Sequence, residues 1–333
     1  MSEFIDADEA ALLATSFAAA MVDAPGPGEA DQALNDLGWA DLLDAAPAHG
    51  AAIAFGALGA TGSAATLLDD VVAHALGFPI SPSVCVLFSA HLHTNPAAPQ
   101  PGDPRSLMDE NPLVVDGLVS SRIDQATTVL FAVDEFPGTE VASVDAGWLR
   151  ESVTTGIDPA HAYRHVSARV PTEAVTPVVA EGNWEPAVTA ARMALAHQLI
   201  GGARWMLAEA RQHAIDRVQF GRPVASFQAI RHKLAESLVL IEGAESLAVA
   251  CLRDPDPMLV ALAKSLAGKA ALTTAAHAQQ VLAGIGFTNE RRFHLWLKRM
   301  MVVDTLYGSS KWLTTEIGRD LLIFGTVPRL IEI

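Results

Sequence analysis

The chain has 333 residues, 50% of them hydrophobic, and a formal net charge of −16 at pH 7. The charge is uneven, because residues 1–181 carry 5 Lys/Arg and 25 Asp/Glu whereas residues 182–333 carry 17 and 13. The acidic first half repels nucleic acid and anionic membrane surfaces, so neither is expected as a partner.

The cysteines and the start of the chain bear on location. Cys85 and Cys251 have neither the spacing of metal ligands nor that of a disulfide framework. The acidic start "MSEFIDADEA" lacks the basic flank of a signal peptide. No apolar run reaches the roughly 18–20 residues that span a membrane. We therefore expect a cytoplasmic protein with no membrane segment and no metal site.

Along the chain, the composition and the spacing of apolar residues change twice. Residues 1–80 are rich in alanine and leucine, and "AALLATSFAAAMVDA" and "ATLLDDVVAHALG" show helical spacing of apolar residues. Residues 81–180 contain short β-branched segments ("SVCVLFSA", "LVVDGLVS", "ATTVLFAVD", "TEVASVD"), which predict a small, mostly antiparallel β unit. The segment "TNPAAPQPGDPRSLMDENP" is a proline-rich loop.

Helical periodicity returns in residues 181–333. It covers 187–213, 228–252 and 258–282, which predicts long helices packed as an antiparallel bundle. The second of these ranges has an apolar stripe, formed by Ile230, Leu234, Leu238, Ile241 and either Leu247 or Ala248.

Two stretches of this last zone are more specific than periodicity. They are "DRVQFGRPVASFQAIRHKLAES" (216–237) and "AHAQQVLAGIGFTNERRFHLW" (276–296). The first resembles the Arg-x-x-Phe-Gly and Phe-Gln signature of the acyl-CoA dehydrogenase family, and the second resembles its Gln-x-x-Gly-Gly-x-Gly-Phe-x-x-Glu run. The resemblance implies an N-terminal α domain (1–80), a small, truncated middle β domain (81–180) and a C-terminal four-helix bundle (181–333).

The family resemblance also implies FAD shared across a subunit interface, with the bundle of one subunit holding the ADP half. Carried over by position, Arg217 would pair with the pyrophosphate and Gly284 would let backbone approach the phosphates. The other residues so implicated are Gln219, Phe220, Gln228 and Gln280, with Arg222 as a weaker candidate. Taken singly, Phe220 and Phe227 also suit a core, Arg217 suits a helix end, and Gly284 suits a turn.

The catalytic base of the family has no counterpart here. Family members abstract a proton with a glutamate at one of two positions, which Tyr307 and Ala191 occupy in this chain. Tyrosine would need a pKa shift of about three units, roughly 4 kcal/mol, to ionise readily near neutral pH. Asp304 and His197 lie near these positions in sequence but are offset along their helices, so we expect no catalytic base.

The β zone also departs from the family pattern. An Asn-Gly-like turn is expected at Asp116–Gly117, and Ser121 stands where the family has a tryptophan that covers the flavin ring. The Gly-Ser-Asp loop of the family is replaced by "AHLHTNPAAPQPG" (90–102). We therefore expect the flavin-ring site to be absent while the ADP site is retained.

These observations favour a non-catalytic subunit of an α2β2 FAD-dependent acyl-CoA dehydrogenase, of the type found in actinobacteria that degrade steroid side chains. Its partner would be a second acyl-CoA dehydrogenase subunit that carries the catalytic glutamate, and the complex would bind the acyl-CoA substrate. Two alternatives stay open. One is a homomeric dehydrogenase with Tyr307 or Asp304 as an unusual base, and the other is a flavin-free scaffold or acyl-CoA-binding protein.

Overall fold

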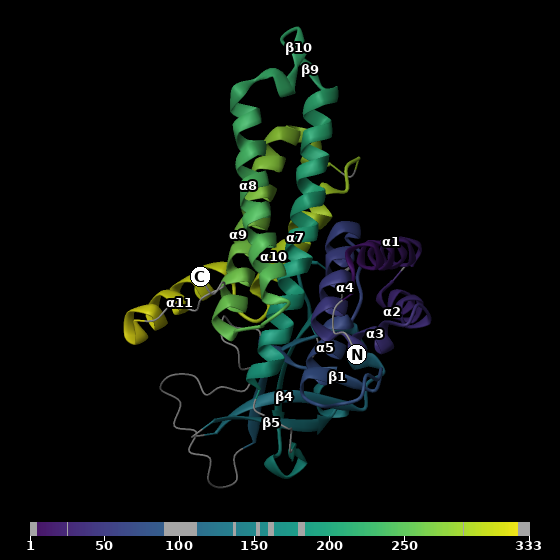
Figure 1. Cartoon of the computed structure of the whole chain (residues 1–333). Coiled ribbons are helices and arrows are strands. Elements are labelled where there is room, and N and C mark those ends of the chain that lie inside the picture. The colour runs from purple at the N-terminus through teal and green to yellow at the C-terminus, as the bar shows by residue number, and fades with distance from the viewer. Residues whose placement is uncertain are drawn as a thin grey trace.

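The structure is a computed structural model of the whole chain, and it describes residues 5–24, 26–89, 112–135, 138–150, 154–158, 163–178, 184–288 and 290–325. Helices come first, strands follow, and a long helical bundle completes the chain (Figure 1). The division expected at 1–80, 81–180 and 181–333 stays a prediction, because element bounds alone do not establish domains.

Short helices form the N-terminal unit. They are α1 (Ala7–Asp23), α2 (Pro27–Asp36), α3 (Trp39–Ala45), α4 (Pro47–Thr61) and α5 (Leu67–Ala75). The Asp6 side chain caps α1 by accepting a hydrogen bond from the backbone of Glu9 at 2.9 Å. Proline occupies the first turn of α2 and of α4, where its missing N–H costs no hydrogen bond. Local sequence thus sets where several of these helices begin.

The β unit is two four-stranded sheets. Its strands are β1 (Val84–Val86), β2 (Phe88–Ser89), β3 (Leu113–Val119), β4 (Thr128–Glu135), β5 (Gly138–Asp145), β6 (Thr154–Thr155), β7 (Arg164–Val170) and β8 (Thr176–Val178). The sheet orders are β1-β4-β5-β8 and β2-β3-β7-β6. Only β1 and β4 pair in parallel among the described strands. Short elements α6 (Gly147–Arg150), η1 (Ser121–Asp124) and η2 (Thr172–Ala174) complete the unit.

The turn expected at Asp116–Gly117 is wrong. Both residues lie inside β3, where Asp116 pairs with Ser167 and Gly117 pairs with Val166 of β7. A Cβ on Gly117 would lie 2.5 Å from the Phe88 carbonyl oxygen, so glycine is needed here for close approach of β2. Ser121, which stands at the tryptophan position of the family, begins η1. The replaced loop at 90–102 lies outside the described residues.

The bundle contains the longest helices, and α7 and α8 meet at a small hairpin at its far end (Figure 1). Its elements are α7 (Glu185–Asp216), β9 (Val218–Gln219), β10 (Arg222–Pro223), η3 (Val224–Ser226), α8 (Gln228–Cys251), α9 (Pro257–Leu282), η4 (Ala283–Phe287), α10 (Phe293–Thr305) and α11 (Ser310–Phe324). Leu238 of the expected stripe is 44% exposed. Ser237 is fully buried instead, with its hydroxyl 3.1 Å from His277 Nδ1.

One stretch of the described residues, Pro257–Phe287, is long and apolar enough to cross a membrane by length and composition. In its most apolar window, 67% of the residues are buried inside the protein. The stretch contains α9, which packs extensively against α7 and α8. Its apolar character is therefore that of a helix in the core of the bundle.

Glycines bring α4 of the N-terminal unit into backbone contact with α7 of the bundle. A Cβ on Gly59 would lie 2.1 Å from the Gln198 carbonyl oxygen, and a Cβ on Gly201 would lie 2.3 Å from the Gly56 carbonyl oxygen. Real Cβ atoms do not approach oxygen so closely, so any side chain here forces the helices apart. The two units therefore share one core.

A buried arginine joins α10 to the other two units. Arg299 Nε donates to Asp158 Oδ2 at 3.0 Å, and Nη1 of the same side chain donates to the carbonyls of Gly62 and Ser63 at the end of α4. One turn earlier, Trp296 Nε1 donates to the Gly59 carbonyl at 3.0 Å. Helix, strand and bundle regions thus meet at one guanidinium group.

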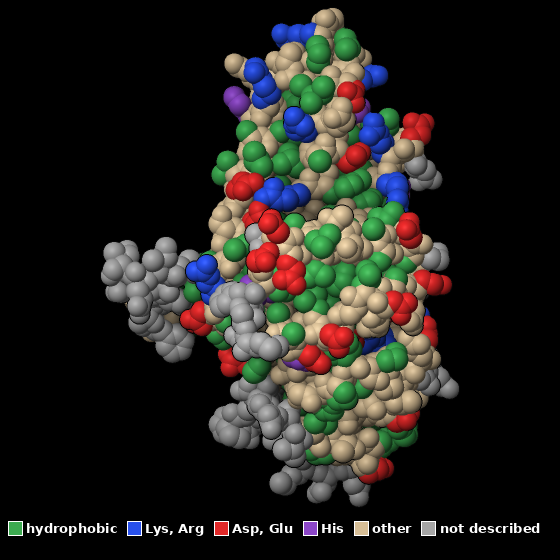
Figure 2. Space-filling model, turned by 45° about the vertical axis from the view of Figure 1, so that its right-hand side comes forward, with side chains coloured by type: hydrophobic (Ala, Val, Ile, Leu, Met, Phe, Trp, Pro, Cys, Tyr) green, Lys and Arg blue, Asp and Glu red, His purple; other side chains and the backbone are tan. Residues whose placement is uncertain are grey.

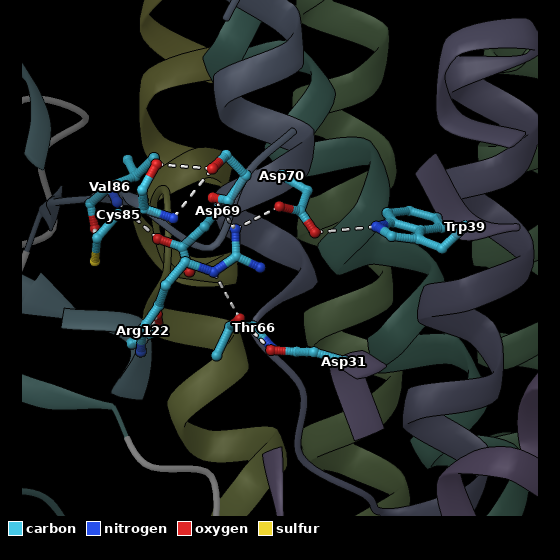
Figure 3. Close-up of polar contacts among 11 residues, drawn as sticks. Asp31, Trp39, Thr66, Asp69, Asp70, Cys85, Val86 and Arg122 are labelled. Atoms are coloured by element: carbon cyan, nitrogen blue, oxygen red, sulfur yellow. Dashed lines mark hydrogen bonds and ion pairs between the residues drawn. The ribbon is translucent and has the colours of Figure 1, made fainter. Parts of the chain in front are cut away.

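A second buried network joins the N-terminal helices to the β unit (Figure 3). Arg122 of η1 donates to Asp70 of α5 and, through Nε at 2.9 Å, to Thr66 Oγ1. Asp70 also accepts from Trp39 Nε1 at 3.0 Å. The neighbouring Asp69 accepts from the backbone N–H of Val86 in β1 at 2.6 Å. Burial raises the pKa of Asp69 to about 6, although Arg122 acts in the opposite direction.

The contact between α4 and α7 predicts that Gly201→Ala destabilises the protein by about 2–4 kcal/mol, because the added methyl group overlaps the α4 backbone. Chemical denaturation measures this loss. Gly243→Ala is the matched control, since a Cβ there meets nothing within 4 Å on exposed α8. It should stabilise by up to about 1 kcal/mol. Equal behaviour of the two variants would contradict backbone contact.

The raised pKa of Asp69 predicts a pH dependence of stability. The folded state binds the proton more tightly than the unfolded state, so this contribution is complete below about pH 4 and is lost as pH rises through about 6. The unfolding free energy of the wild type minus that of Asp69→Asn should fall across this range by on the order of 3 kcal/mol. A difference that stays flat between pH 4 and 6.5 would show that Asp69 does not titrate there.

Candidate functional site

The far end of the bundle is a tight turn between α7 and α8. Arg217 follows the last residue of α7, and the β9–β10 hairpin reverses at Phe220 (φ 54°) and Gly221 (φ 75°). Two consecutive positive φ angles characterise the two-residue hairpin turn, and phenylalanine rarely adopts one. The hairpin is closed by Val224 N–H, which donates to the Arg217 carbonyl at 2.8 Å. The strained turn holds Phe220 outward.

Aromatic and cationic side chains cluster on this hairpin. Phe220 is 91% exposed, so the core role considered for it from sequence is wrong. Its ring lies edge-on to that of Phe227, with centroids 6.2 Å apart, and Arg222 lies over the Phe227 ring at 4.2 Å. Gln219 Nε2 donates to the Val218 carbonyl at 2.7 Å. The cluster presents one aromatic face to the outside.

Hydrogen-bonding groups beside this cluster are exposed and uncommitted. Arg217 and Gln228 are exposed, and neither side chain forms an ion pair or hydrogen bond within the described part of the chain. Figure 2 shows further Lys and Arg side chains over the same end of the bundle, whereas Asp and Glu gather lower down. Such a surface attracts an anion, and a free guanidinium suits two phosphate oxygens.

The end of α9 contributes the rest of the predicted residues. The first residues of α7 and α9 lie near each other, since Glu185 and Pro257 line the same two pockets. With 26 residues against 32, α9 stops about 9 Å short of the end of α7. Gln280 and Gly284 are exposed there, and a Cβ on Gly284 would meet nothing within 4 Å. The predicted site residues therefore lie in two groups at one end of the bundle.

Ala283 explains why the related motif has glycine at this position. It follows α9 with φ 52° and ψ −134°, a backbone conformation that favours glycine strongly. Its carbonyl accepts from Gln279 Nε2 at 3.2 Å. The alanine thus adopts a strained turn that keeps Gly284 at the surface.

The candidate base position holds a buried tyrosine. Tyr307 is 1% exposed, has φ 54°, and packs edge-on against Phe88 of β2 with centroids 5.8 Å apart. Phe88 in turn packs edge-on against Tyr163 at 5.9 Å. Burial raises the pKa of the Tyr307 phenol well above its usual value of 10, so the hydroxyl stays protonated. Aromatic rings therefore occupy the space beside the base position.

The backbone around Tyr307 is fixed by two cations that sequence reasoning missed in this role. Arg192 Nε donates to the Tyr307 carbonyl at 3.1 Å. Lys264 Nζ donates to the carbonyls of Asp304 at 3.0 Å and Gly308 at 3.3 Å, and burial lowers the lysine pKa to about 8. A lone lysine inside the apolar segment "MLVALAKSLAG" was the available signal, since buried charges require specific partners.

The remaining candidate bases are committed or neutral. Asp304 is 5% exposed, and its carboxylate accepts from the backbone and hydroxyl of Ser310 at 3.1 and 3.3 Å. Ala191 is fully buried in α7. Burial lowers the pKa of His197 to about 4, so its ring is uncharged near neutral pH. Among these described residues, none presents an ionised base to a cavity.

Comparisons with known proteins agree with this architecture. Residues 185–322 match the family "Acyl-CoA dehydrogenase, C-terminal domain". Acyl-CoA dehydrogenase IpdE2 of Mycobacterium tuberculosis is 38% identical over 109 residues, which cover 33% of this chain and 34% of IpdE2. The chain therefore matches only about a third of the length of this relative.

Solved structures extend the similarity to the whole chain. The ChsE4–ChsE5 complex of M. tuberculosis contains a chain with a TM-score of 0.72 at 19% identity, covering 99% of this chain and 100% of that one. A Tcur3481–Tcur3483 steroid ACAD variant gives 0.74 at 20% identity, with 95% and 96% covered. The acyl-CoA dehydrogenase-like fold and the resemblance inferred from the motifs are confirmed.

The strain at Ala283 predicts that Ala283→Gly stabilises the protein. Release of about 1–3 kcal/mol of backbone strain exceeds the added chain entropy of up to about 1 kcal/mol. The midpoint temperature of thermal unfolding should rise by a few degrees. Ala276→Gly, at an exposed position inside α9, is the control and should destabilise by about 1 kcal/mol. A loss of stability in both variants would contradict strain at Ala283.

Proposed function

We propose that this chain is a non-catalytic subunit of a heteromeric, FAD-dependent acyl-CoA dehydrogenase. Its bundle end completes a FAD site shared with a partner subunit, and the partner carries the catalytic glutamate. The observation that carries the proposal is the contrast between the position of the catalytic base and the residues proposed to bind the nucleotide. The base position is filled by protonated, buried Tyr307. By contrast, the proposed nucleotide-binding residues Arg217 and Gln228 are exposed and form no ion pair or side-chain hydrogen bond among the described residues.

The exposed group fits the ADP half of FAD. Arg217 offers a guanidinium without an internal ion pair, which suits a pyrophosphate. Gly284 leaves its surroundings open to close approach by phosphate, and Phe220 offers a flat apolar face to an adenosine. Gln219, Gln228 and Gln280 add amide groups nearby. When bound, FAD would supply the hydride acceptor, and the residues of this chain would only hold and orient its nucleotide half.

The flavin-ring half fits this chain poorly. Phe88, Tyr163 and Tyr307 pack on one another beside the base position. A ring could enter only if these buried side chains moved, at a cost of several kcal/mol in lost packing. This supports a division of labour in which the ring and the reacting acyl group lie in the partner.

A partner is also supported by exposed apolar side chains on the hairpin and α8. Val218 is 54% exposed, Phe220 is 91% exposed and Val239 is 70% exposed. Exposed large apolar side chains of this kind are typical of an interaction site when they lie close together. The solved neighbours include ChsE4–ChsE5, named as a complex, and Tcur3481–Tcur3483, named as a steroid ACAD. We extend both properties to this chain as part of the proposal, with a steroid acyl-CoA as substrate of the complex.

The test is co-expression with a candidate partner, an acyl-CoA dehydrogenase subunit from the same organism that carries the catalytic glutamate. We expect a colourless chain alone and a yellow complex with about one flavin per two chains. Arg217→Met should weaken FAD retention about 10- to 100-fold, because one charge-assisted interaction is lost. Arg253→Met is the matched control at the other end of α8 and should retain FAD. One FAD per chain in the isolated protein would contradict a shared site.

Turnover by the same complex distinguishes a non-catalytic role of this chain from a catalytic role of Tyr307. Tyr307→Phe removes only the buried hydroxyl, so turnover of the acyl-CoA should stay within about twofold of the wild type. A loss of more than tenfold with FAD still bound would assign the reaction to Tyr307. Retained turnover together with FAD loss in Arg217→Met would match a chain that holds the cofactor without acting on substrate.

A further inference from the structure

A large pocket lies at the opposite end of the bundle from Arg217. Its volume is about 630 Å³, within the range of small-molecule sites. One wall comes from the N-terminal unit, through Leu43, Ala51 and Val71, and the other comes from α7, through Ala190 and Met193. None of Phe88, Tyr163 and Tyr307 lines it. The pocket is therefore distinct from the aromatic-filled space at the base position.

Prolines give this pocket stiff and apolar edges. Pro47, Pro186 and Pro257 line it, and each lies in the first turn of a helix, α4, α7 and α9 respectively. Proline has a fixed φ and no N–H, so these walls are preformed and present few donors to an anion. A preformed apolar wall lowers the entropy cost of binding an apolar molecule.

Three polar side chains among the lining residues limit the ligand's chemistry. They are His74, Glu185 and Thr189. His74 Nε2 lies 3.2 Å from Asp44 Oδ1, and the imidazole Nδ1 has no hydrogen-bond partner among the described residues. In the neutral tautomer that carries its N–H at Nε2, facing Asp44, Nδ1 can accept a hydrogen bond. Among the polar lining residues, His74 and Glu185 offer hydrogen-bond acceptors, and Thr189 offers a hydroxyl that can donate or accept.

The charge around the pocket disfavours anions. Glu185 lines it, Asp44 stands behind His74, and the lining contains neither Lys nor Arg within the described residues. The positive ends of the α7 and α9 helix dipoles already interact with acidic side chains, namely Glu185 in the first turn of α7 and the N-cap Asp256 of α9. Among the described residues, the lining therefore offers no cationic partner to a carboxylate or a phosphate.

We propose that this pocket binds a mostly apolar alcohol and disfavours anions. The apolar body lies against Ala51, Ala190 and Met193, and the hydroxyl donates to His74 and accepts from Thr189. A molecule of this class differs from acyl-CoA, whose phosphates the acidic rim excludes. The inference is independent of the shared FAD site, since the two lie at opposite ends of α7.

The experiment uses a homologous set of probes on the full chain: 1-decanol, decanoate and decylamine, which share one alkyl chain and differ in head group. Binding is followed by ¹³C-methyl NMR of methionine, because Met193 lines the pocket and buried Met206 serves as an internal reference. Decanol should shift the Met193 signal alone, with decanoate at least tenfold weaker. Thr189→Val should weaken decanol about two- to tenfold, through loss of one hydrogen bond.

A pocket-filling variant provides the second arm. Ala190→Phe should abolish the decanol shift while its unfolding midpoint remains near that of the wild type. If it fails to fold, Thr189→Val and the head-group series still decide the matter. Decanoate binding as tightly as decanol, or decylamine binding more than tenfold tighter than decanol, would overturn the alcohol assignment. A Met193 signal that ignores all three probes and moves only when the partner subunit is added would overturn the ligand site in favour of a subunit contact.

Discussion

The placement of the three regions of this protein depends on one buried cation. Arg299 reaches the β unit through Asp158 and the N-terminal helices through the carbonyls of Gly62 and Ser63, while its own helix belongs to the bundle. A buried guanidinium without partners is costly, so all of these acceptors must be in place together. Trp296, stacked on Trp205 with ring centroids 3.6 Å apart, holds the same helix against α7. The end of this same helix, α10, leads directly into the loop of Tyr307.

Rigidity is therefore concentrated where a dehydrogenase would carry out its chemistry. Arg192 and Lys264 bind the carbonyls of the Tyr307 loop, and aromatic rings fill the space beside it. A catalytic carboxylate needs room for substrate and freedom to exchange a proton, and this loop offers neither. The opposite end of α7 has the reverse character. Phe220 is exposed beside Phe227, and Arg217 is exposed without an ion pair or side-chain hydrogen bond among the described residues. The same fold thus combines a closed centre with an open tip.

Local sequence patterns predicted α1, α5, the three long helices α7, α8 and α9, and the strands β1 to β5, because periodicity and caps act over a few residues. The Arg217 and Gln280 motifs likewise located the open tip. The errors came from long-range contacts. Gly117 looked like a turn residue but serves close strand packing against Phe88, and Leu238 fitted a helical stripe but lies on the outside. The networks of Arg122 and Arg299 join residues more than 40 positions apart, which no local pattern reveals.

The exposed hairpin limits the concentration at which the uncovered chain can accumulate in a cell. Phe220 is kept outside by backbone geometry, so a chain without cover cannot bury it by a simple rotation of the side chain. Val218, on the same hairpin, is also exposed. Chains made in excess of whatever covers this surface would stick to one another or be degraded. Matched rates of synthesis, as for two neighbouring genes translated from one message, would keep the surface covered from the start.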